Sequence, residues 1–159
     1  HTMGSHGPAY FKRYPPEFEV FTPTCKTSQL NECTDEEITN AYDNTILYTD
    51  YFLSKVIGVL KVNSDNSDTA MFYISDHGES LGEGGLYLHG MPYFMAPDEQ
   101  IKIPAFMWFD ESISRIFDIG SIKEKAELPQ SHDSLFHTLL GLMDVETELY
   151  KKDLDLLAE

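Results

Sequence analysis

The sequence is short of positive charge. Its 159 residues include 11 lysines and arginines against 27 aspartates and glutamates, a formal net charge of −16. Electrostatic binding of nucleic acid requires a basic surface, so we expect no nucleic-acid partner. Any anionic substrate would have to be held locally, by a metal ion or a few cations. The ordinary explanation of such acidity is a well-solvated surface.

Long hydrophobic runs are also missing. No stretch of about 18 apolar residues occurs, so no segment is expected to span a bilayer, and the first residues lack a signal-peptide pattern. Apolar residues still make up 42% of the chain, which predicts a folded globular domain. The start, HTMGSHGPAY, contains a Gly-Ser-His triplet that could be a cloning scar.

Cysteine is scarce, with only Cys25 and Cys33 present, separated by the polar stretch KTSQLNE. Free cysteines are usually buried among apolar neighbours, and these are not. A short disulfide that closes a surface loop is therefore favoured, and it would imply an oxidising compartment such as a periplasm. Two unpaired surface thiols, or half of a zinc site, are the alternatives.

Turn-forming residues dominate the first 34 positions, which we interpret as a long ordered loop. Thr34 and Glu37 then form a capping-box pattern, in which each side chain can satisfy the other residue's amide. Apolar residues follow at helical spacing as far as Leu60. This spacing predicts a helix of about 25 residues with one apolar face.

Two short apolar runs predict buried strands, TAMFYIS at 69–75 and IPAFMWF at 103–109. The segment 76–102 between them is rich in glycine and proline and too long for a simple connector, which indicates a functional loop. A last helix is expected to open at 131–134. This order predicts an α/β fold with a mainly parallel sheet flanked by helices.

The first predicted strand ends on Asp76 and His77, and sites in parallel sheets form at the carboxyl ends of strands. A carboxylate oxygen and an imidazole nitrogen are a pair suited to Zn²⁺. Gly78 permits the sharp turn that would let both reach one ion, and Glu79 follows directly. In the structural alternative, Asp76 caps a turn and His77 bonds to the backbone.

Further histidines lie in the two long loops: His89 after the first strand, and His1 and His6 near the start. Imidazoles gathered by a rigid sheet can bind a metal, neutralise phosphate oxygens or protonate a leaving group. His132 and His137 belong to the last helix, and we interpret them as structural. No serine lies in a Gly-x-Ser-x-Gly elbow, and no Walker-type phosphate loop occurs.

These motifs resemble one family over nearly the whole chain. It is the periplasmic catalytic domain of the lipid A phosphoethanolamine transferases, which include the mobile colistin-resistance enzymes, in the alkaline phosphatase and sulfatase superfamily. The matching segments occur in family order: HTMGSHGPAYFKRYP, CKTSQLNEC, NAYDNTILYTDYFL, SDHGES, YLHG, IPAFMWF and SHDSLFHTLLGL. The resemblance implies a sulfatase-like α/β fold and a native, histidine-containing start.

The resemblance also implies roles for individual residues. Asp76 and His77 correspond to ligands of the catalytic zinc ion, and Glu79 would join the metal site near a second ion or the substrate. His1 and His89 would be catalytic residues that face the transferred phosphate group and sometimes bind a second zinc ion. His6 receives no role.

The family's glutamate zinc ligand and threonine nucleophile belong to a portion that precedes the matching segments. Residues 1–159 are therefore expected to be the C-terminal portion of a single periplasmic catalytic domain, without its N-terminal portion and inner-membrane anchor, and inactive alone. Cys25 and Cys33 correspond to one of several family disulfides. Gly84 stands where many members have asparagine, which removes no ligand.

The activity implied is zinc-dependent transfer of phosphoethanolamine from phosphatidylethanolamine to a lipid A phosphate, which gives resistance to colistin. The same metal site serves sulfatases, phosphatases and phosphodiesterases, so these are alternatives within the superfamily. An inactive, metal-free fragment that merely keeps the fold is the alternative from a different class.

Overall fold

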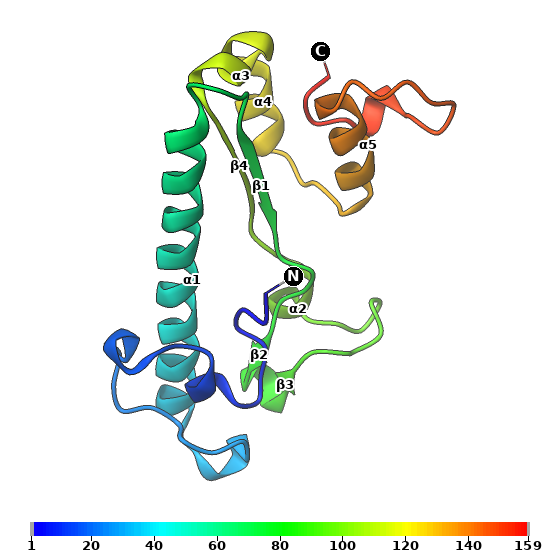
Figure 1. The fold of residues 1–159 in the computed structure, drawn as a ribbon. Helices are drawn as coiled ribbons and strands as arrows, with labels where there is room; N and C mark the ends of the chain where they lie inside the picture. Colours follow the sequence, from blue (N-terminus) through cyan, green and yellow to red (C-terminus); the bar gives the residue numbers. More distant parts are fainter. Residues whose placement is uncertain (1, 159) are drawn as a thin grey trace. The chain divides into compact units, whose positions relative to one another are not determined.

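The structure, a computed structural model, describes residues 2–158, so the prediction for His1 lies outside the described residues. Its elements follow one another as Figure 1 shows. The α-helices are α1 (Asp35–Asn63), α2 (Asp98–Ile101), α3 (Glu111–Ile116), α4 (Ile119–Ala126) and α5 (Asp133–Leu142). The strands are β1 (Ala70–Ile74), β2 (Ser80–Leu81), β3 (Tyr87–Leu88) and β4 (Ala105–Phe109). The 3₁₀-helices are η1 (Tyr10–Lys12), η2 (Pro16–Phe18), η3 (Leu30–Glu32), η4 (Glu83–Gly85) and η5 (Lys152–Leu154).

The chain forms two compact units. The first contains the residues up to Asn63 together with Met71–Trp108, and the second contains Ser64–Ala70 and the residues from Phe109 onward. Every described residue of the predicted site falls in the first unit. The two histidines interpreted as structural fall in the second.

Helix α1 begins where the sequence predicts it. The N–H of Thr34 donates to Oε2 of Glu37 at 2.8 Å, and the N–H of Glu37 donates to Oγ1 of Thr34 at 3.2 Å, which completes the capping box. The helix continues for 29 residues to Asn63, so the predicted long helix is confirmed. None of the described helices has both the length and the apolar character that crossing a bilayer requires.

The core of the first unit lies where the N-terminal segment packs on the first half of α1. Tyr10 and Ile38 are almost completely buried there. Asn44 of α1 is also buried, and its side chain accepts from the N–H groups of Val20 and Phe21 and donates to the carbonyl of Phe21, each at 2.9 Å. The side chain of Asn44 thus satisfies backbone groups of the loop that no helix or strand pairs.

A disulfide joins Cys25 and Cys33 on either side of η3. Cys25 belongs to the core and Cys33 packs against it. The predicted pairing is confirmed, and neither cysteine is left as a free thiol or as part of a zinc site. The expectation that the cysteines lie away from apolar neighbours is wrong for Cys25, which is buried in the core.

The strands form two separate pairs, β1 with β4 and β2 with β3. The N–H of Asp110, after β4, donates to the carbonyl of Thr69 before β1, and the N–H of Ser75, after β1, donates to the carbonyl of Pro104 before β4. The start of each strand therefore lies beside the end of the other, so the pair is antiparallel. The pair β2–β3 is antiparallel as well.

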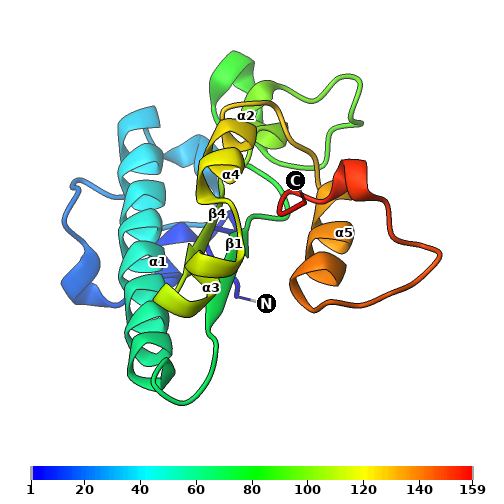
Figure 2. The same ribbon diagram turned by 90° about the horizontal axis from the view of Figure 1, so that it is seen from above.

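The mixed content of helices and strands is confirmed, but the mainly parallel sheet is not, because the described strands form only two-stranded antiparallel pairs. Parallel neighbours need a crossover, usually a long helix. The only α-helix between β1 and β4 is α2, with four residues, so the chain returns antiparallel. The residues of β1 are half-buried rather than fully covered. Helix α1 runs beside the β1–β4 pair, as Figure 1 and Figure 2 both show.

Two helices not predicted from the sequence, α3 and α4, occupy the weakly patterned stretch after β4. Each begins at an aspartate cap. Oδ1 of Asp110 accepts the N–H of Ile113, and Oδ1 of Asp118 accepts the N–H of Gly120, both at 2.9 Å. These two aspartates were the signal that could have predicted the helices. The predicted last helix is confirmed as α5.

Candidate metal centre

The turn after β1 packs directly against the backbone of α2. The N–H of Gly78 donates to the carbonyl of Gln100 at 3.0 Å, and a Cβ on Gly78 would lie 2.0 Å from the carbonyl oxygen of Glu99. Glycine is thus required by the close approach of two backbones, and not by a positive φ. Oγ of Ser75 donates to the carbonyl of His77 at 2.8 Å and closes the turn.

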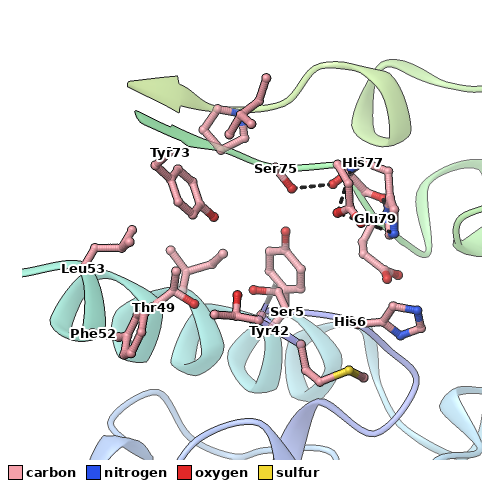
Figure 3. Close-up of a pocket in the computed structure, with 18 of the residues that line it drawn as sticks. Ser5, His6, Tyr42, Thr49, Phe52, Leu53, Tyr73, Ser75, His77 and Glu79 are labelled. Carbon is pink, nitrogen blue, oxygen red and sulfur yellow. Dashed lines mark hydrogen bonds and ion pairs between the residues drawn. The ribbon is translucent and has the colours of Figure 1, made fainter. Parts of the chain in front are cut away.

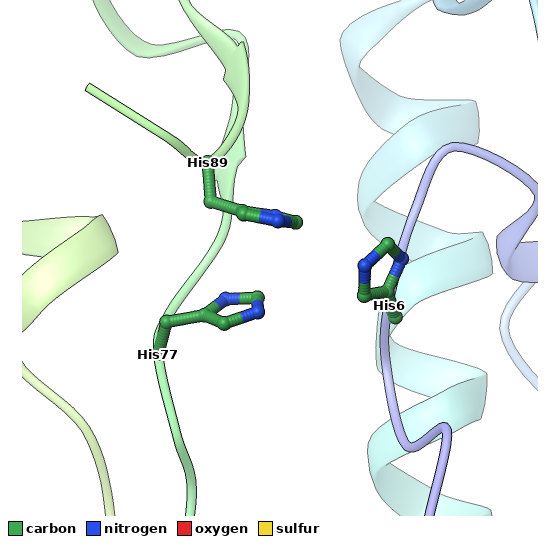
Figure 4. Close-up of side chains that lie close together, drawn as sticks. All are labelled: His6, His77 and His89. Carbon is green, nitrogen blue, oxygen red and sulfur yellow. The ribbon is translucent and has the colours of Figure 1, made fainter.

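Three histidines from separate segments converge in the first unit, as Figure 4 shows: His6 from the N-terminal segment, His77 from the turn after β1, and His89 directly after β3. One nitrogen of each ring lies within 4.8 Å of those of the other two. The ring centres of His77 and His89 are 3.8 Å apart, and those of His6 and His89 are 4.9 Å apart. The structure therefore adds His6, to which the sequence assigned no role.

Each of these imidazoles has a hydrogen-bond partner at Nδ1. The Nδ1 atoms of His6 and His77 lie 2.7 Å and 2.9 Å from the carbonyl oxygen of the glycine that follows each. Nδ1 of His89 lies 3.0 Å from Oε1 of Glu79. Carbonyl and carboxylate oxygens only accept, so each Nδ1 carries a proton, and in the neutral ring Nε2 then keeps its lone pair. Metal-ligating histidines have this arrangement.

Glu79 is the buried carboxylate of the site, 7% exposed. Besides His89, its Oε1 accepts the N–H of Gly7 at 3.2 Å, and its Oε2 accepts the hydroxyl of Tyr10 at 3.0 Å. Burial and then the charge of Glu79 raise the pKa of Tyr10, which keeps the hydroxyl protonated as a donor. These contacts orient His89 and fasten the N-terminal segment. The predicted place of Glu79 beside a second metal ion or the substrate stays a prediction.

Asp76 lies next to His77, with 65% of its side chain exposed. Its Oδ1 accepts the N–H of His77 at 3.1 Å and lies 3.9 Å from Nε2 of the same residue. Two ligands about 2.0–2.1 Å from a tetrahedral zinc ion are about 3.3 Å apart, so a small side-chain rotation would let both atoms share one ion. Asp76 stands outside the three-nitrogen cluster. Zinc binding by Asp76 and His77 stays a prediction.

A cavity of about 450 Å³ lies in the first unit between α1 and β1. His6, His77 and Glu79 stand at one end of it in Figure 3. Burial raises the pKa of Tyr42 and of Tyr73, and the charge of a neighbouring carboxylate adds to each shift, so both hydroxyls remain donors. The rest of the lining includes apolar side chains: Ile46, Phe52, Leu53 and Phe72.

The second unit holds His132 and His137, which take no part in the cluster. His137 is buried, and its Nδ1 accepts the N–H of Lys151 at 3.1 Å. This bond fastens the C-terminal segment to α5 and supports the structural interpretation of His137. His132 stands at the N-cap of α5.

Three imidazoles that converge beside a buried carboxylate, in a mixed helix-and-strand fold, form a candidate metal site. The family model described as Sulfatase matches residues 1–145. The chain belongs to the sulfatase family.

Individual relatives narrow the similarity to phosphoethanolamine transferases. Phosphoethanolamine transferase EptA of Escherichia coli (strain K12) is 48% identical over 160 residues, which cover 99% of this chain and 29% of the relative. The crystal structure of the C-terminal periplasmic domain of phosphoethanolamine transferase EptC from Campylobacter jejuni is 51% identical, with a TM-score of 0.90, and the match covers 98% of this chain and 49% of that one.

The soluble domain of lipooligosaccharide phosphoethanolamine transferase A from Neisseria meningitidis is 48% identical, with a TM-score of 0.94, and the match covers 99% of this chain and 48% of that one. This chain thus spans less than a third of the length of the curated relative and about half of each solved domain. The resemblance inferred from the sequence motifs is confirmed.

Proposed function

We propose that this chain carries the histidine-rich part of the metal centre of a zinc-dependent phosphoethanolamine transferase. The donor would be phosphatidylethanolamine and the acceptor a lipid A phosphate. The observation that carries the proposal is the convergence of His6, His77 and His89, each with its Nδ1 hydrogen-bonded to an acceptor. The names of the similar proteins, which specify phosphoethanolamine transfer and a lipooligosaccharide acceptor, support the choice of substrate.

Zinc suits the residues at this site. Imidazole nitrogen and carboxylate oxygen are its common ligands, and the Nδ1 partners would hold the rings with Nε2 available. The side chains of His77 and His89 are 31% and 30% exposed, which leaves access for a substrate. When bound, zinc lowers the pKa of a nucleophile and offsets phosphoryl charge.

Two roles then divide among the residues of the chain. Asp76 and His77 would hold the ion, as the sequence predicts. His6 and His89 would present Nε2 to a second zinc ion or, where that ion is not bound, to the transferred phosphate group. There a protonated imidazole could give its proton to the oxygen that leaves with diacylglycerol. Such general-acid assistance typically contributes about 10²–10⁴-fold to a rate. His1, predicted as the second catalytic histidine, lies outside the described residues.

The proposed setting is the periplasmic face of a bacterial inner membrane. The disulfide between Cys25 and Cys33 is compatible with an oxidising compartment, and one of the similar structures is a periplasmic domain by name. Phosphoethanolamine adds an ammonium group to a lipid A phosphate and reduces its attraction for a cationic peptide antibiotic. Colistin resistance is the phenotype that follows.

The test combines metal content with a cellular phenotype. The purified complete transferase should contain zinc by inductively coupled plasma mass spectrometry. His77→Ala and His89→Ala should reduce the zinc content, whereas His132→Ala, in the second unit, should not. In a susceptible strain that expresses the complete transferase, the first two variants should lose colistin resistance and the mass signature of modified lipid A.

A zinc-free wild-type complete transferase, or unchanged lipid A modification in His77→Ala, would rule the proposal out. Hydrolysis of an aryl sulfate or phosphate ester without lipid A modification would point instead to another activity of the superfamily.

A further inference from the structure

We propose that Gln100 is a positioning residue for the metal centre. It joins the two loops that carry His77 and His89 and so sets the separation between their Nε2 atoms. The inference rests on the proposed function, because it concerns the geometry of the same site.

Gln100 lies in α2 and is 6% exposed. Its Nε2 donates to Oγ of Ser80 at 2.9 Å, and its Oε1 accepts the N–H of Met91 at 3.4 Å. Its own carbonyl accepts the N–H of Gly78 at 3.0 Å. One buried residue therefore contacts the turn that follows β1, the start of β2, and the segment that follows β3.

Ser80 connects Gln100 to the strand pair that precedes His89. It directly follows Glu79, is fully buried, and pairs with Leu88 across β2 and β3. Leu88 has a φ of 65°, which is unfavourable for a large side chain and persists only where surrounding contacts enforce it. Leu88 immediately precedes His89. The bond from Gln100 to Ser80 thus supports the strand pair that brings His89 to Glu79.

The described hydrogen bonds of Gln100 reach no imidazole, so its role is indirect. A purely structural glutamine would stabilise the unit without affecting metal affinity. A positioning glutamine alters the spacing of the ligand nitrogens when its side-chain bonds are removed. These two roles differ in metal affinity and in the ligand field, which are both measurable.

The variants separate the two roles. Gln100→Met keeps the volume of the side chain and the backbone bond to Gly78 but removes both side-chain bonds. Ser80→Ala removes the hydroxyl oxygen that accepts the hydrogen bond from Nε2 of Gln100. Gln100→Glu is the conservative variant, because a carboxylate can accept from the Ser80 hydroxyl and from the Met91 N–H. The matched control is Gln130→Met, an exposed glutamine whose side chain donates to a backbone carbonyl.

Three quantities are measured on the complete transferase: zinc affinity by competition with a chromophoric chelator, the d–d absorption of the Co²⁺-loaded protein, and the Tm of the metal-free protein. Gln100→Met should weaken zinc binding about tenfold, as supporting residues around metal ligands do, and should shift the Co²⁺ absorption. Ser80→Ala should have the same two effects. The double variant should bind zinc as tightly as the single variant with the lower affinity. Gln100→Glu should recover most of the affinity, and Gln130→Met should match wild type.

A lowered Tm with wild-type affinity and spectrum would overturn the positioning role. Additive losses in the double variant would overturn it too, because the two residues would then act independently. If Gln100→Met fails to fold, the zinc affinities, Co²⁺ spectra and Tm values of Ser80→Ala and Gln100→Glu decide between the two roles. A wild-type complete transferase that binds no metal would overturn the proposed function and this inference together. Normal metal binding by the wild type with unaffected variants would overturn this inference alone.

Discussion

Glu79 and His89 are joined by a hydrogen bond between Oε1 and Nδ1, 3.0 Å long, that connects the interior of the first unit with its cluster of three histidines. The carboxylate side chain is 4% exposed and the imidazole 30%. The proton on Nδ1 thus points inward, and in the neutral ring Nε2 keeps its lone pair. The pair has the carboxylate–histidine arrangement that second-layer carboxylates provide in metalloproteins.

Glu79→Gln should weaken zinc binding by about 10–100-fold, because a neutral amide is a weaker acceptor for Nδ1–H of His89. Chelator competition measures the change. Glu36→Gln, at an exposed position in the first turn of α1, is the control and should leave affinity at the wild-type value. Equal affinities for both variants would refute a supporting role for Glu79.

Two helical glycines should respond to alanine with opposite signs. Gly58 in α1 has nothing within 4 Å of an added Cβ, so Gly58→Ala should stabilise the chain by about 0.5–1 kcal/mol. At Gly141 in α5 the Cβ would lie 2.0 Å from Oδ2 of the buried Asp155. Gly141→Ala should therefore destabilise by about 1–3 kcal/mol despite the gain in helix propensity. Urea unfolding measures both, and stabilisation at Gly141 would contradict the observed packing.

Replacing both Cys25 and Cys33 by serine should lower the free energy of unfolding by about 2–3 kcal/mol, because the unfolded chain regains the freedom of the short loop. The measurement is chemical denaturation with and without a reducing agent. Reduced wild type should approach the double variant, and the variant itself should be insensitive to the reductant. If full reduction leaves the free energy of unfolding of the wild type unchanged, the disulfide does not contribute to stability.

The hydroxyl of Tyr150 donates to Oδ2 of Asp155 at 2.7 Å, and this bond, with burial and the nearby charge, raises the pKa of Tyr150 to about 12. An unfolded tyrosine titrates near pH 10. The folded state holds the proton more tightly, so the stabilisation is complete below about pH 10 and is lost as the pH rises toward 12. Unfolding free energies measured between about pH 9 and pH 12 should fall less steeply for Tyr150→Phe than for wild type.

The control for this pH series is Tyr93→Phe, at a side chain that is 81% exposed. It should follow the wild-type curve. If the unfolding free energy falls equally steeply with pH in Tyr150→Phe and in wild type, the raised pKa of Tyr150 is contradicted.

Features that depend on neighbours in the sequence were predicted well. The capping box involves residues three positions apart, and the disulfide closes a loop over a separation of eight residues, so composition and spacing hold most of the information. Asp76 and His77 were singled out because two ligand types follow an apolar run. The antiparallel return of β4 was missed, since pairing direction depends on the path of a long loop that has no periodic pattern.

The histidine cluster depends on contacts that no local pattern contains. Gly7 and Glu79 are 72 positions apart, yet a hydrogen bond between them brings the N-terminal segment, and with it His6, to the turn after β1. The burial of Glu79 and the close approach of Gly78 to α2 likewise exist only in the folded chain. Short-range chemistry along the sequence was enough to identify the chelating residue types, the long helix and the disulfide. Long-range packing selected which imidazoles meet and which nitrogen each presents.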